Sequence, residues 1–349
     1  MLYERLSDLE LEIEDYDLTQ RERDTSSGFT RATTIVSLHG DGETGRGEDV
    51  TYDNDAHETL RGTTVEFPVT GRYTLETFSD QLSAIDFFLG NEPNQSIFRN
   101  YRQWAFESAA LDLALKQADT NLADRLGRTY ERVRFVVSTR LEEPPTGDRV
   151  LDWLDRDPDL EFKLDPTSEW SDDVVQRLAA TDTVQILDLK GQYHGTTVDQ
   201  PADPELYERV IEGFPEALIE DPALTDETRP LFEGHEPRVT WDYPIRSVET
   251  VEKLPWEPAW LNIKPSRFGS VQSLFETIDY CREHEIQLFG GGQFELDVGR
   301  EHLHAIASLF YPNAPNDIAP KAYNDPEPSG DLPSTPLTPP ADPRGLSWK

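Results

Sequence analysis

The sequence is poor in cysteine and contains no long apolar segment. A single cysteine, Cys281, excludes a framework of intramolecular disulfides, and its helical surroundings predict a core position. No run of 18 apolar residues occurs, which excludes an ordinary transmembrane helix. The first residues, Met1–Glu4, lack the basic and apolar segments of a signal peptide. We therefore expect a cytoplasmic protein with no membrane partner.

Basic residues, and lysines above all, are scarce. The chain has 68 acidic and 32 basic residues, a net charge of -36, and only seven of its bases are lysines. This charge excludes binding of duplex nucleic acid through a basic surface. It is typical of proteins that stay soluble in concentrated salt, where self-repulsion is screened, so we predict a halophilic protein. An acidic mimic of nucleic acid stays open as an alternative, whereas 7 Trp, 12 Tyr and 16 Phe argue against a disordered chain.

The first third of the chain has the pattern of a small α+β domain. Alternating apolar and polar residues predict strands at 9–15, 29–38 and 47–52. The glycine-rich segment 39–48 predicts a hairpin turn before the third strand. Helical periodicity follows at 73–88 and 102–118, and Gly127 is typical of a helix C-terminus. We therefore assign residues 1–128 to an α+β domain.

After Gly127, strands and helices alternate. We predict strands at 133–138, 161–165, 184–189, 217–220, 238–242, 260–264, 286–289 and 293–295. The helices between them are predicted from 171, at 204–213, at 270–284 and at 300–309. About eight such repeats indicate an α/β fold of the (β/α)8 (TIM-type) barrel class over residues 129–311. Residues 312–349 are rich in proline and predict an irregular surface tail that packs back on the first domain.

Charged residues recur where the predicted barrel strands end. The acids at these positions are Asp188, Glu220 and Asp242, and the lysines are Lys163, Lys190 and Lys264. In a parallel barrel these ends share one rim, where active sites lie. Three acids from neighbouring strands form an oxygen-rich site suited to Mg²⁺. A single acid at a strand end can equally cap a helix or face solvent, but the recurrence over five strands favours a site.

Four segments resemble motifs of the enolase superfamily. They are most similar to the branch of muconate-lactonizing enzymes, o-succinylbenzoate synthases and dipeptide epimerases, in the mandelate racemase/muconate lactonizing enzyme family. Residues 42–48 resemble the G-x-x-G-x-GE turn of the capping domain, and Glu107–Ala114 its E-x-A-x-x-D helix. Asn262–Gly269 is similar to the strand-six lysine motif, and Gly291–Gly299 to the glutamate segment near strand eight. Their order over roughly residues 10–310 makes the set specific.

The resemblance implies an N-terminal α+β capping domain on the barrel and a carboxylate as substrate. It implies that Asp188, Glu220 and Asp242 bind Mg²⁺ and that Lys264 is an acid/base group. Residues that it implies near the substrate are Glu295, Arg267 and Gly291. The glycines 290–292 either hold an anion or merely turn the chain.

The implied reaction is abstraction of a proton α to a carboxylate, with an enediolate intermediate. The enzyme would be a lyase of the o-succinylbenzoate-synthase kind or an isomerase, either a cycloisomerase or an epimerase. Its expected partner is a small-molecule carboxylate. The sequence leaves open whether the protein forms a homo-oligomer.

Two motifs depart from the family pattern. Lys163-Leu164-Asp165 stands where Lys-x-Lys is usual, and Asp188-Leu189-Lys190 where Asp-x-Asn is usual. One hypothesis is that Lys190 replaces the missing lysine, oriented by Asp165, with its pKa lowered by nearby cations. The alternative is a structural Asp165–Lys190 ion pair, with Lys264 alone in the chemistry. A non-catalytic, metal-binding scaffold is the third possibility, because the lysine pair is incomplete.

Overall fold

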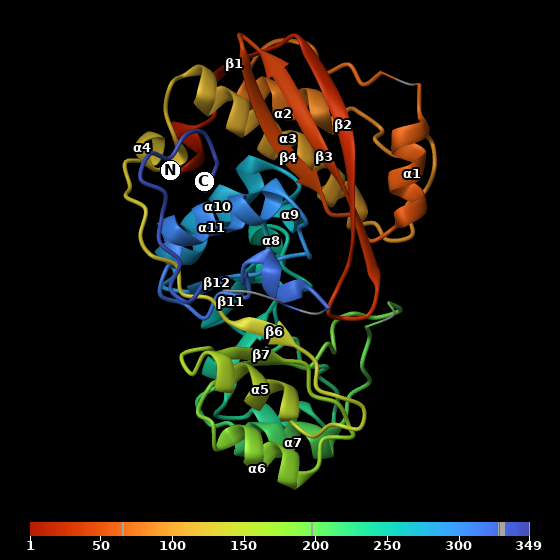
Figure 1. The fold of residues 1–349 in the computed structure, drawn as a ribbon, viewed down its shortest axis with the longest axis vertical. Helices are drawn as coiled ribbons and strands as arrows, with labels where there is room; N and C mark the ends of the chain where they lie inside the picture. Colours follow the sequence, from red (N-terminus) through yellow and green to blue (C-terminus); the bar gives the residue numbers. More distant parts are fainter. Residues whose placement is uncertain (65, 197, 327, 329–331, 349) are drawn as a thin grey trace.

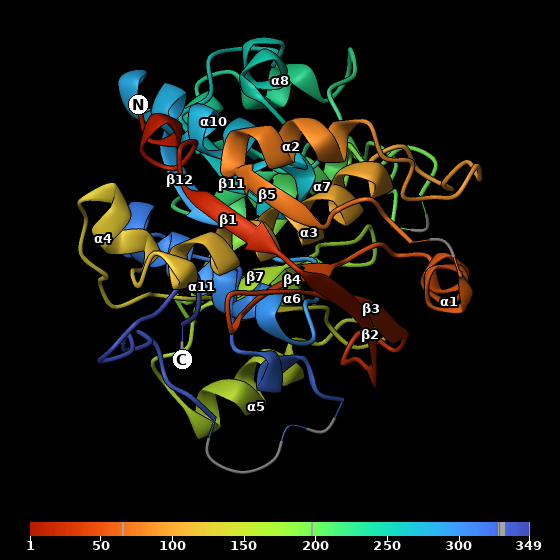
Figure 2. The ribbon, with the colours of Figure 1, turned by 90° about the horizontal axis from the view of Figure 1, so that it is seen from above.

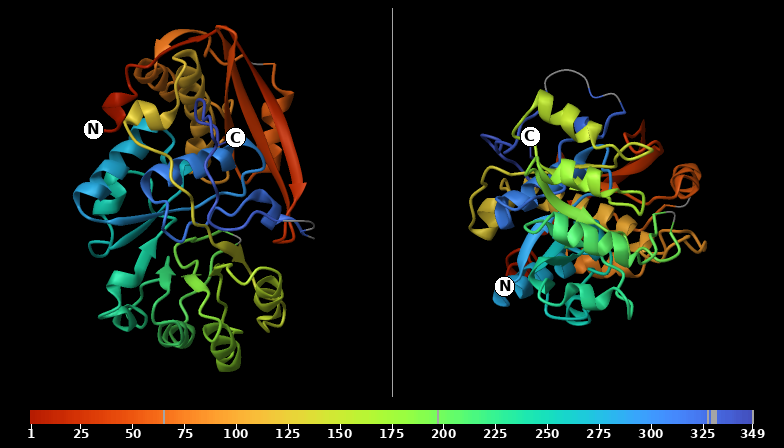
Figure 3. Two further views of the ribbon diagram at one scale, coloured as in Figure 1. Left: turned by 60° about the vertical axis from the view of Figure 1, so that its left-hand side comes forward. Right: turned by 90° about the horizontal axis from the view of Figure 1, so that it is seen from below.

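The computed structural model describes residues 1–64, 66–196, 198–326, 328 and 332–348. Figure 1 shows two stacked parts: the N-terminal strands and helices at the top, and the strands and helices from β6 onward below. Seen from above, the N-terminal domain lies across the other part (Figure 2). The C-terminal segment returns along the N-terminal domain, so both chain ends lie at this end of the molecule (Figure 3). Residues 327, 329–331 and 349 of the predicted tail lie outside the described part.

The N-terminal domain is α+β. Its strands are β1 (Glu10–Ile13), β2 (Asp15–Asp24), β3 (Thr30–Gly40), β4 (Glu43–Asp49) and β5 (Gly71–Thr74). Its helices are α1 (Asn54–Gly62), α2 (Leu75–Ser83), α3 (Phe98–Gln117) and α4 (Leu122–Leu126). The β2-β3-β4 sheet is antiparallel, and β1 pairs with β5. The prediction missed β2 because this strand is largely polar and exposed, without a clear apolar alternation.

The glycine-rich motif of residues 42–48 forms a strand and not a long turn, which corrects the prediction. Only residues 41 and 42 make the turn, both with positive φ, and β4 begins at Glu43. A β-carbon on Gly45 would lie 2.1 Å from the carbonyl oxygen of Ala109, and one on Gly47 1.9 Å from that of Ala105. The glycines therefore allow α3 to pack directly on β4.

The second part contains a parallel sheet of seven strands in sequential order, β6 to β12. The strands are β6 (Val137–Thr139), β7 (Phe162–Leu164), β8 (Val184–Asp188), β9 (Leu218–Glu220), β10 (Val239–Trp241), β11 (Trp260–Ile263) and β12 (Gln287–Gly290). The helices around them are α5 (Asp148–Arg156), α6 (Asp172–Ala179), α7 (Pro204–Gly213), α8 (Val248–Glu252), α9 (Pro265–Phe268), α10 (Val271–Glu283) and α11 (Val298–Phe310). Cys281 on α10 is buried, as predicted.

The predicted (β/α)8 barrel is only partly confirmed. Residues 293–295, predicted as a last strand, form none, because Phe294 has a φ of 54° and breaks the extended backbone. Instead a short segment forms one bridge at each end of the sheet: Asn316 pairs with Phe135, and Asp317 with Gly291. This segment lies in the region predicted as a surface tail, where local sequence gives no strand signal.

Buried acids of the N-terminal domain cap helices of the other part. Glu48 accepts hydrogen bonds from the backbone N–H groups of Leu296, Asp297 and Gly299, where α11 begins. Glu107 accepts one from Val271 N at the start of α10, 3.3 Å away. Carboxylates are favourable partners for the free N–H groups of a helix N-terminus. The two acids therefore fix the N-terminal domain over the sheet.

Among the described residues, no helix combines the length and the apolar composition that a membrane crossing requires.

Candidate metal centre and active site

Three fully buried carboxylates meet at the C-terminal ends of neighbouring strands. Asp188 is the last residue of β8, and Glu220 is the last residue of β9. The two residues are partners in the register of these strands, and Asp242 directly follows β10. Each offers an oxygen, and these oxygens all lie within 4.8 Å of one another. Side chains alternate along a strand, so the apolar neighbours Leu187, Ile219 and Trp241 point to the other face.

Lys163 on β7 reaches this cluster from one side. Its side chain is 1% exposed, and its Nζ donates to Glu220 Oε1 and lies 3.0 Å from Asp188 Oδ2. A further carboxylate, that of Asp317, lies 3.2 Å from the same Nζ. Burial alone would lower the pKa of Lys163, but Asp188 and Glu220 raise it well above its usual value. The ammonium form is therefore held in place.

Lys190 lies on the same side but outside the strand. It has a φ of 55°, so a turn and not strand alternation directs its side chain. Its Nζ bonds to Asp188 Oδ2 and lies 3.5 Å from Asp165 Oδ1. Burial opposes the charge, yet Asp165 and Asp188 raise the pKa of Lys190. These two acids outweigh Lys163, the neighbouring base, and a lowering of this pKa by a bound Mg²⁺ stays a prediction.

Asp242 is contacted from the opposite side. Lys264, which follows β11, places its Nζ 2.9 Å from Asp242 Oδ2. Arg267 Nη1 lies 3.2 Å from Asp242 Oδ1, and the hydroxyl of Tyr193 donates to Oδ2 at 2.7 Å. Arg267, predicted near the substrate, is thus directed at Asp242 and Tyr193.

The pKa values of the three acids move in different directions. Burial opposes ionisation of all three, but Lys163 and Lys190 hold the pKa of Asp188 well below its usual value. Arg267 and Lys264 likewise hold the pKa of Asp242 well below its usual value. Burial, with repulsion from Asp188 and Asp242, raises the pKa of Glu220 well above its usual value despite Lys163. The cluster therefore titrates as a coupled set.

The donor set fits a divalent cation. Mg²⁺ prefers carboxylate oxygens, and three of them converge here on a water-excluded rim. Asp242 Oδ1 is buried and accepts no hydrogen bond in the described part of the chain. Six acids gather at these strand ends, Asp165, Asp188, Glu220, Asp221, Asp242 and Asp317. Five bases contact these acids, Lys163, Lys190, Lys264, Arg267 and Arg140.

Gly291 and Glu295, also predicted near the substrate, contact neighbouring residues in this structure. A β-carbon on Gly291 would lie 2.4 Å from Asn262 Oδ1 and 2.6 Å from Lys264 Cε, so this glycine makes room for the lysine. Glu295 pairs with Arg300 at 3.0 Å and accepts from the backbone N–H of Gln293. Gly290 belongs to β12 and Gly291 bridges to Asp317, so these two glycines continue the sheet and do not turn the chain.

Three further residues complete the site. Asn262 Nδ2 donates to Glu220 Oε2 at 3.1 Å, and Asp221 accepts from the backbone N–H groups of Asp242 and Tyr243. Asp317 contacts Lys163 from the bridging segment. Asn262 lies in the lysine motif and Asp221 follows Glu220, so both could have been found from sequence. No local signal marks Asp317.

Comparison with known families gives two adjoining matches. Residues 4–125 match the model described as "Domain of unknown function (DUF8230) N-terminal domain", and residues 129–325 match the corresponding C-terminal domain. The chain is also 24% identical over 273 residues to o-succinylbenzoate synthase of Bacillus subtilis (strain 168), covering 71% of each protein. It is 27% identical over 239 residues to the o-succinylbenzoate synthase of Geobacillus kaustophilus, covering 64% of this chain and 60% of that enzyme.

Solved structures of the enolase superfamily share the fold. A superfamily member from Listeria innocua Clip11262 superposes with a TM-score of 0.68 at 19% identity, covering 91% of this chain and 88% of that one. The Mg-complexed dipeptide epimerase of Methylococcus capsulatus gives 0.66 at 16% identity, covering 88% and 89%. Muconate cycloisomerase of Pseudomonas fluorescens gives 0.65 at 17% identity, covering 88% and 87%. The resemblance that the motifs indicated is thereby confirmed.

Proposed function

The chain belongs to the family described as domain of unknown function DUF8230, and we propose that it is an enzyme that abstracts a proton α to a carboxylate with the help of Mg²⁺. One observation carries the proposal: three buried carboxylates converge at one rim, with lysines on both sides. The relatives and structural neighbours are lyases and isomerases, which does not favour the scaffold alternative.

In this proposal Asp188, Glu220 and Asp242 hold the ion at the C-terminal edge of the parallel sheet, whose two ends are bridged by residues 316–317. A bound Mg²⁺ would supply Lewis-acid stabilisation of negative charge on the substrate carboxylate. Lys264, as the free amine, would remove the α proton after leaving its ion pair with Asp242. Lys163 would stay protonated and offset negative charge on the other side.

The ion pairs of Lys190 with two acids favour chemistry with one base. An epimerase needs a second group that exchanges a proton on the opposite face of the substrate, and Lys190 is ion-paired with both Asp165 and Asp188. A syn-elimination needs only Lys264, because the amine that takes the α proton can return it to the leaving hydroxyl. We therefore place a lyase of the o-succinylbenzoate-synthase kind first and an isomerase second.

The test is deuterium exchange into a library of carboxylates in D₂O with Mg²⁺, followed by NMR. We expect Lys264→Met to abolish exchange and Lys190→Met to retain it within about tenfold, whereas the exposed Lys321→Met serves as control. Equal loss in both site variants would instead favour Lys190 as the replacement base. Thermal stabilisation by Mg²⁺ that Asp188→Asn removes, with no exchange of any compound, would favour the scaffold.

A further inference from the structure

Lys190 lies between two carboxylates, and only one of them belongs to the converging triad. Its Nζ bonds to Asp188 Oδ2 and lies 3.5 Å from Asp165 Oδ1. The Asp165 oxygen is buried and accepts no hydrogen bond from any residue that the structure describes. Buried carboxylate oxygens usually have a donor, so this oxygen offers the Lys190 ammonium a second position that it does not yet use.

The other oxygen of Asp165 is held from the solvent side. Arg140, an exposed residue, donates from its Nε to Asp165 Oδ2 at 3.2 Å. Because this contact engages Oδ2, the carboxylate is oriented with Oδ1 toward Lys190. A movement of the Lys190 Nζ by less than about 1 Å would bring it to hydrogen-bond distance from Oδ1.

Two lysines share one oxygen of Asp188. The ammonium groups of Lys163 and Lys190 both contact Oδ2, and Oδ1 accepts the backbone N–H of Lys190 at 3.1 Å. A carboxylate oxygen has two lone pairs, so a cation that binds through Oδ2 displaces one of these lysines. Repulsion between the cation and a neighbouring ammonium acts in the same direction, and it is strong in a buried site.

Lys190 can leave Asp188 more easily than Lys163 can. Lys163 is 1% exposed, and two further acids, Glu220 and Asp317, contact its Nζ. The side chain of Lys190 is 13% exposed, and Asp165 lies next to it as a second acid. The long, flexible stem of a lysine lets the ammonium change partner while the backbone stays in place.

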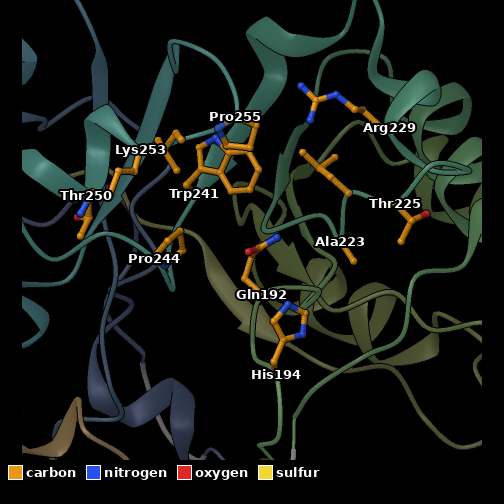
Figure 4. A pocket seen from close by; sticks show the side chains of 12 residues that line it. Gln192, His194, Ala223, Thr225, Arg229, Trp241, Pro244, Thr250, Lys253 and Pro255 are labelled. Carbon is orange, nitrogen blue, oxygen red and sulfur yellow. The ribbon is translucent and has the colours of Figure 1, made fainter.

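The backbone around Lys190 is anchored to the loop that follows β9. The N–H of Gly191 donates to the carbonyl of Asp221 at 2.8 Å. Figure 4 shows the next residue, Gln192, in the lining of a pocket that the loops after β8 and β9 share. The Gln192 amide donates to the carbonyl of Pro222 at 2.6 Å. A change of partner therefore requires only the side chain of Lys190 to move.

We propose that Lys190 is a movable counter-ion, which neutralises Asp188 until a divalent cation binds there and then transfers to Asp165. The inference rests on the proposed metal centre but on none of the proposed proton transfers. The transfer keeps the ammonium paired with an acid throughout. It gives one role to Asp165 and Lys190, the two residues that depart from the motifs of the enolase superfamily.

Isothermal titration of the whole chain with Mg²⁺ tests the transfer in a double-mutant cycle. We expect Asp165→Asn to weaken binding about tenfold, because Lys190 then lacks a second acid and stays on Asp188. In the Lys190→Met background the same substitution should change the dissociation constant by less than about threefold, because no ammonium needs that acid. Asp188 keeps Lys163 as a partner in Lys190→Met.

The cycle separates the transfer from a simple effect of charge. Loss of a negative charge near the ion acts equally in both backgrounds, so equal weakening by Asp165→Asn in the two overturns the transfer. No weakening in either background overturns it as well. Asp148→Asn, which removes an acid that pairs with Arg177 on the surface, is the control and should bind Mg²⁺ as the wild type does.

A crystal structure with Mg²⁺ gives a second readout on the unmodified chain. The Lys190 Nζ should lie within about 3.2 Å of Asp165 Oδ1 and should no longer contact Asp188. An Nζ that remains on Asp188 Oδ2 beside the bound ion overturns the transfer and leaves the proposed function intact. Absence of Mg²⁺ binding in both the wild type and Lys190→Met is a different result, because it overturns the metal centre and the transfer together.

Discussion

Single side chains decide how the metal centre is held. Lys163 is in contact with three carboxylates, and two of them, Asp188 and Glu220, are ligands of the cation in the proposed function. The third, Asp317, lies outside the triad at 3.2 Å from the lysine Nζ. A buried ammonium needs an anionic partner. Asp317 can therefore remain the ion-pair partner of Lys163 when Asp188 and Glu220 bind the cation.

Asp317→Asn should therefore weaken Mg²⁺ binding. Without that carboxylate, Lys163 depends on Asp188 and Glu220 alone and competes with the cation for them. We expect the dissociation constant, measured by isothermal titration, to rise about tenfold, which corresponds to about 1.4 kcal/mol. Asp325→Asn, which removes an acid that pairs with Arg23, is the control. Equal or tighter binding by Asp317→Asn would contradict this role.

At the scale of elements, the contact of β4 with α3 depends on glycine. Gly45 and Gly47 lie where the helix backbone passes too close for any β-carbon. The same strand continues into Glu48, which caps α11. The position of the N-terminal domain over the acids thus follows from this helix–strand packing.

Gly47→Ala should destabilise the protein by about 3 kcal/mol. The new methyl group would meet the carbonyl oxygen of Ala105 at 1.9 Å, and a helix backbone can give way only by moving as a whole. Urea unfolding followed by circular dichroism measures the loss. Gly62→Ala at the end of α1 has open space around its β-carbon and should be close to neutral. Similar stabilities for the two variants would show that α3 does not pack as described.

Glu107, the acid that caps α10, should make stability depend on pH. Burial raises its pKa to about 7, although Ser79 and Val271 N–H hydrogen-bond to it. The folded state then holds a proton that the unfolded chain releases above about pH 4.5, so the free energy of unfolding falls between about pH 4.5 and 7. This contribution is full below that window and absent above it, and it amounts to about 3 kcal/mol.

Chemical denaturation at a series of pH values checks this expectation. Glu107→Gln should flatten the decline between about pH 5 and 7 relative to the wild type. Glu58→Gln, a change at an exposed acid of α1, controls for the loss of one charge. A pH profile of Glu107→Gln that parallels the wild type would mean that Glu107 is ionised in the folded state.

At the scale of the whole molecule, charge is the dominant feature. A net charge of -36 makes the folded chain repel itself, and salt screens this repulsion. The Debye length falls from about 10 Å at 0.1 M to about 3 Å at 1 M salt. Surface ion pairs such as Arg72–Glu12 weaken under the same conditions, but such pairs contribute little.

The midpoint of thermal unfolding should therefore rise between about 0.1 M and 1 M KCl. Differential scanning calorimetry measures it, and sodium chloride at equal ionic strength separates screening from specific ion binding. A midpoint that falls with salt would mean that attractive ion pairs outweigh the net repulsion, and it would count against the predicted halophily.

The sequence by itself determined the parallel strands, most of their boundaries and the acids at their ends. Strand periodicity is local, and the C-terminal ends of parallel strands share one edge. The sequence alone therefore predicted that Asp188, Glu220 and Asp242 lie close together. Only the tertiary structure decided where the lysines point. The turn at Lys190 directs its amine to Asp188, and Asp317 reaches Lys163 from a segment without strand periodicity. Both depend on contacts between distant segments, which neither residue spacing nor propensity encodes.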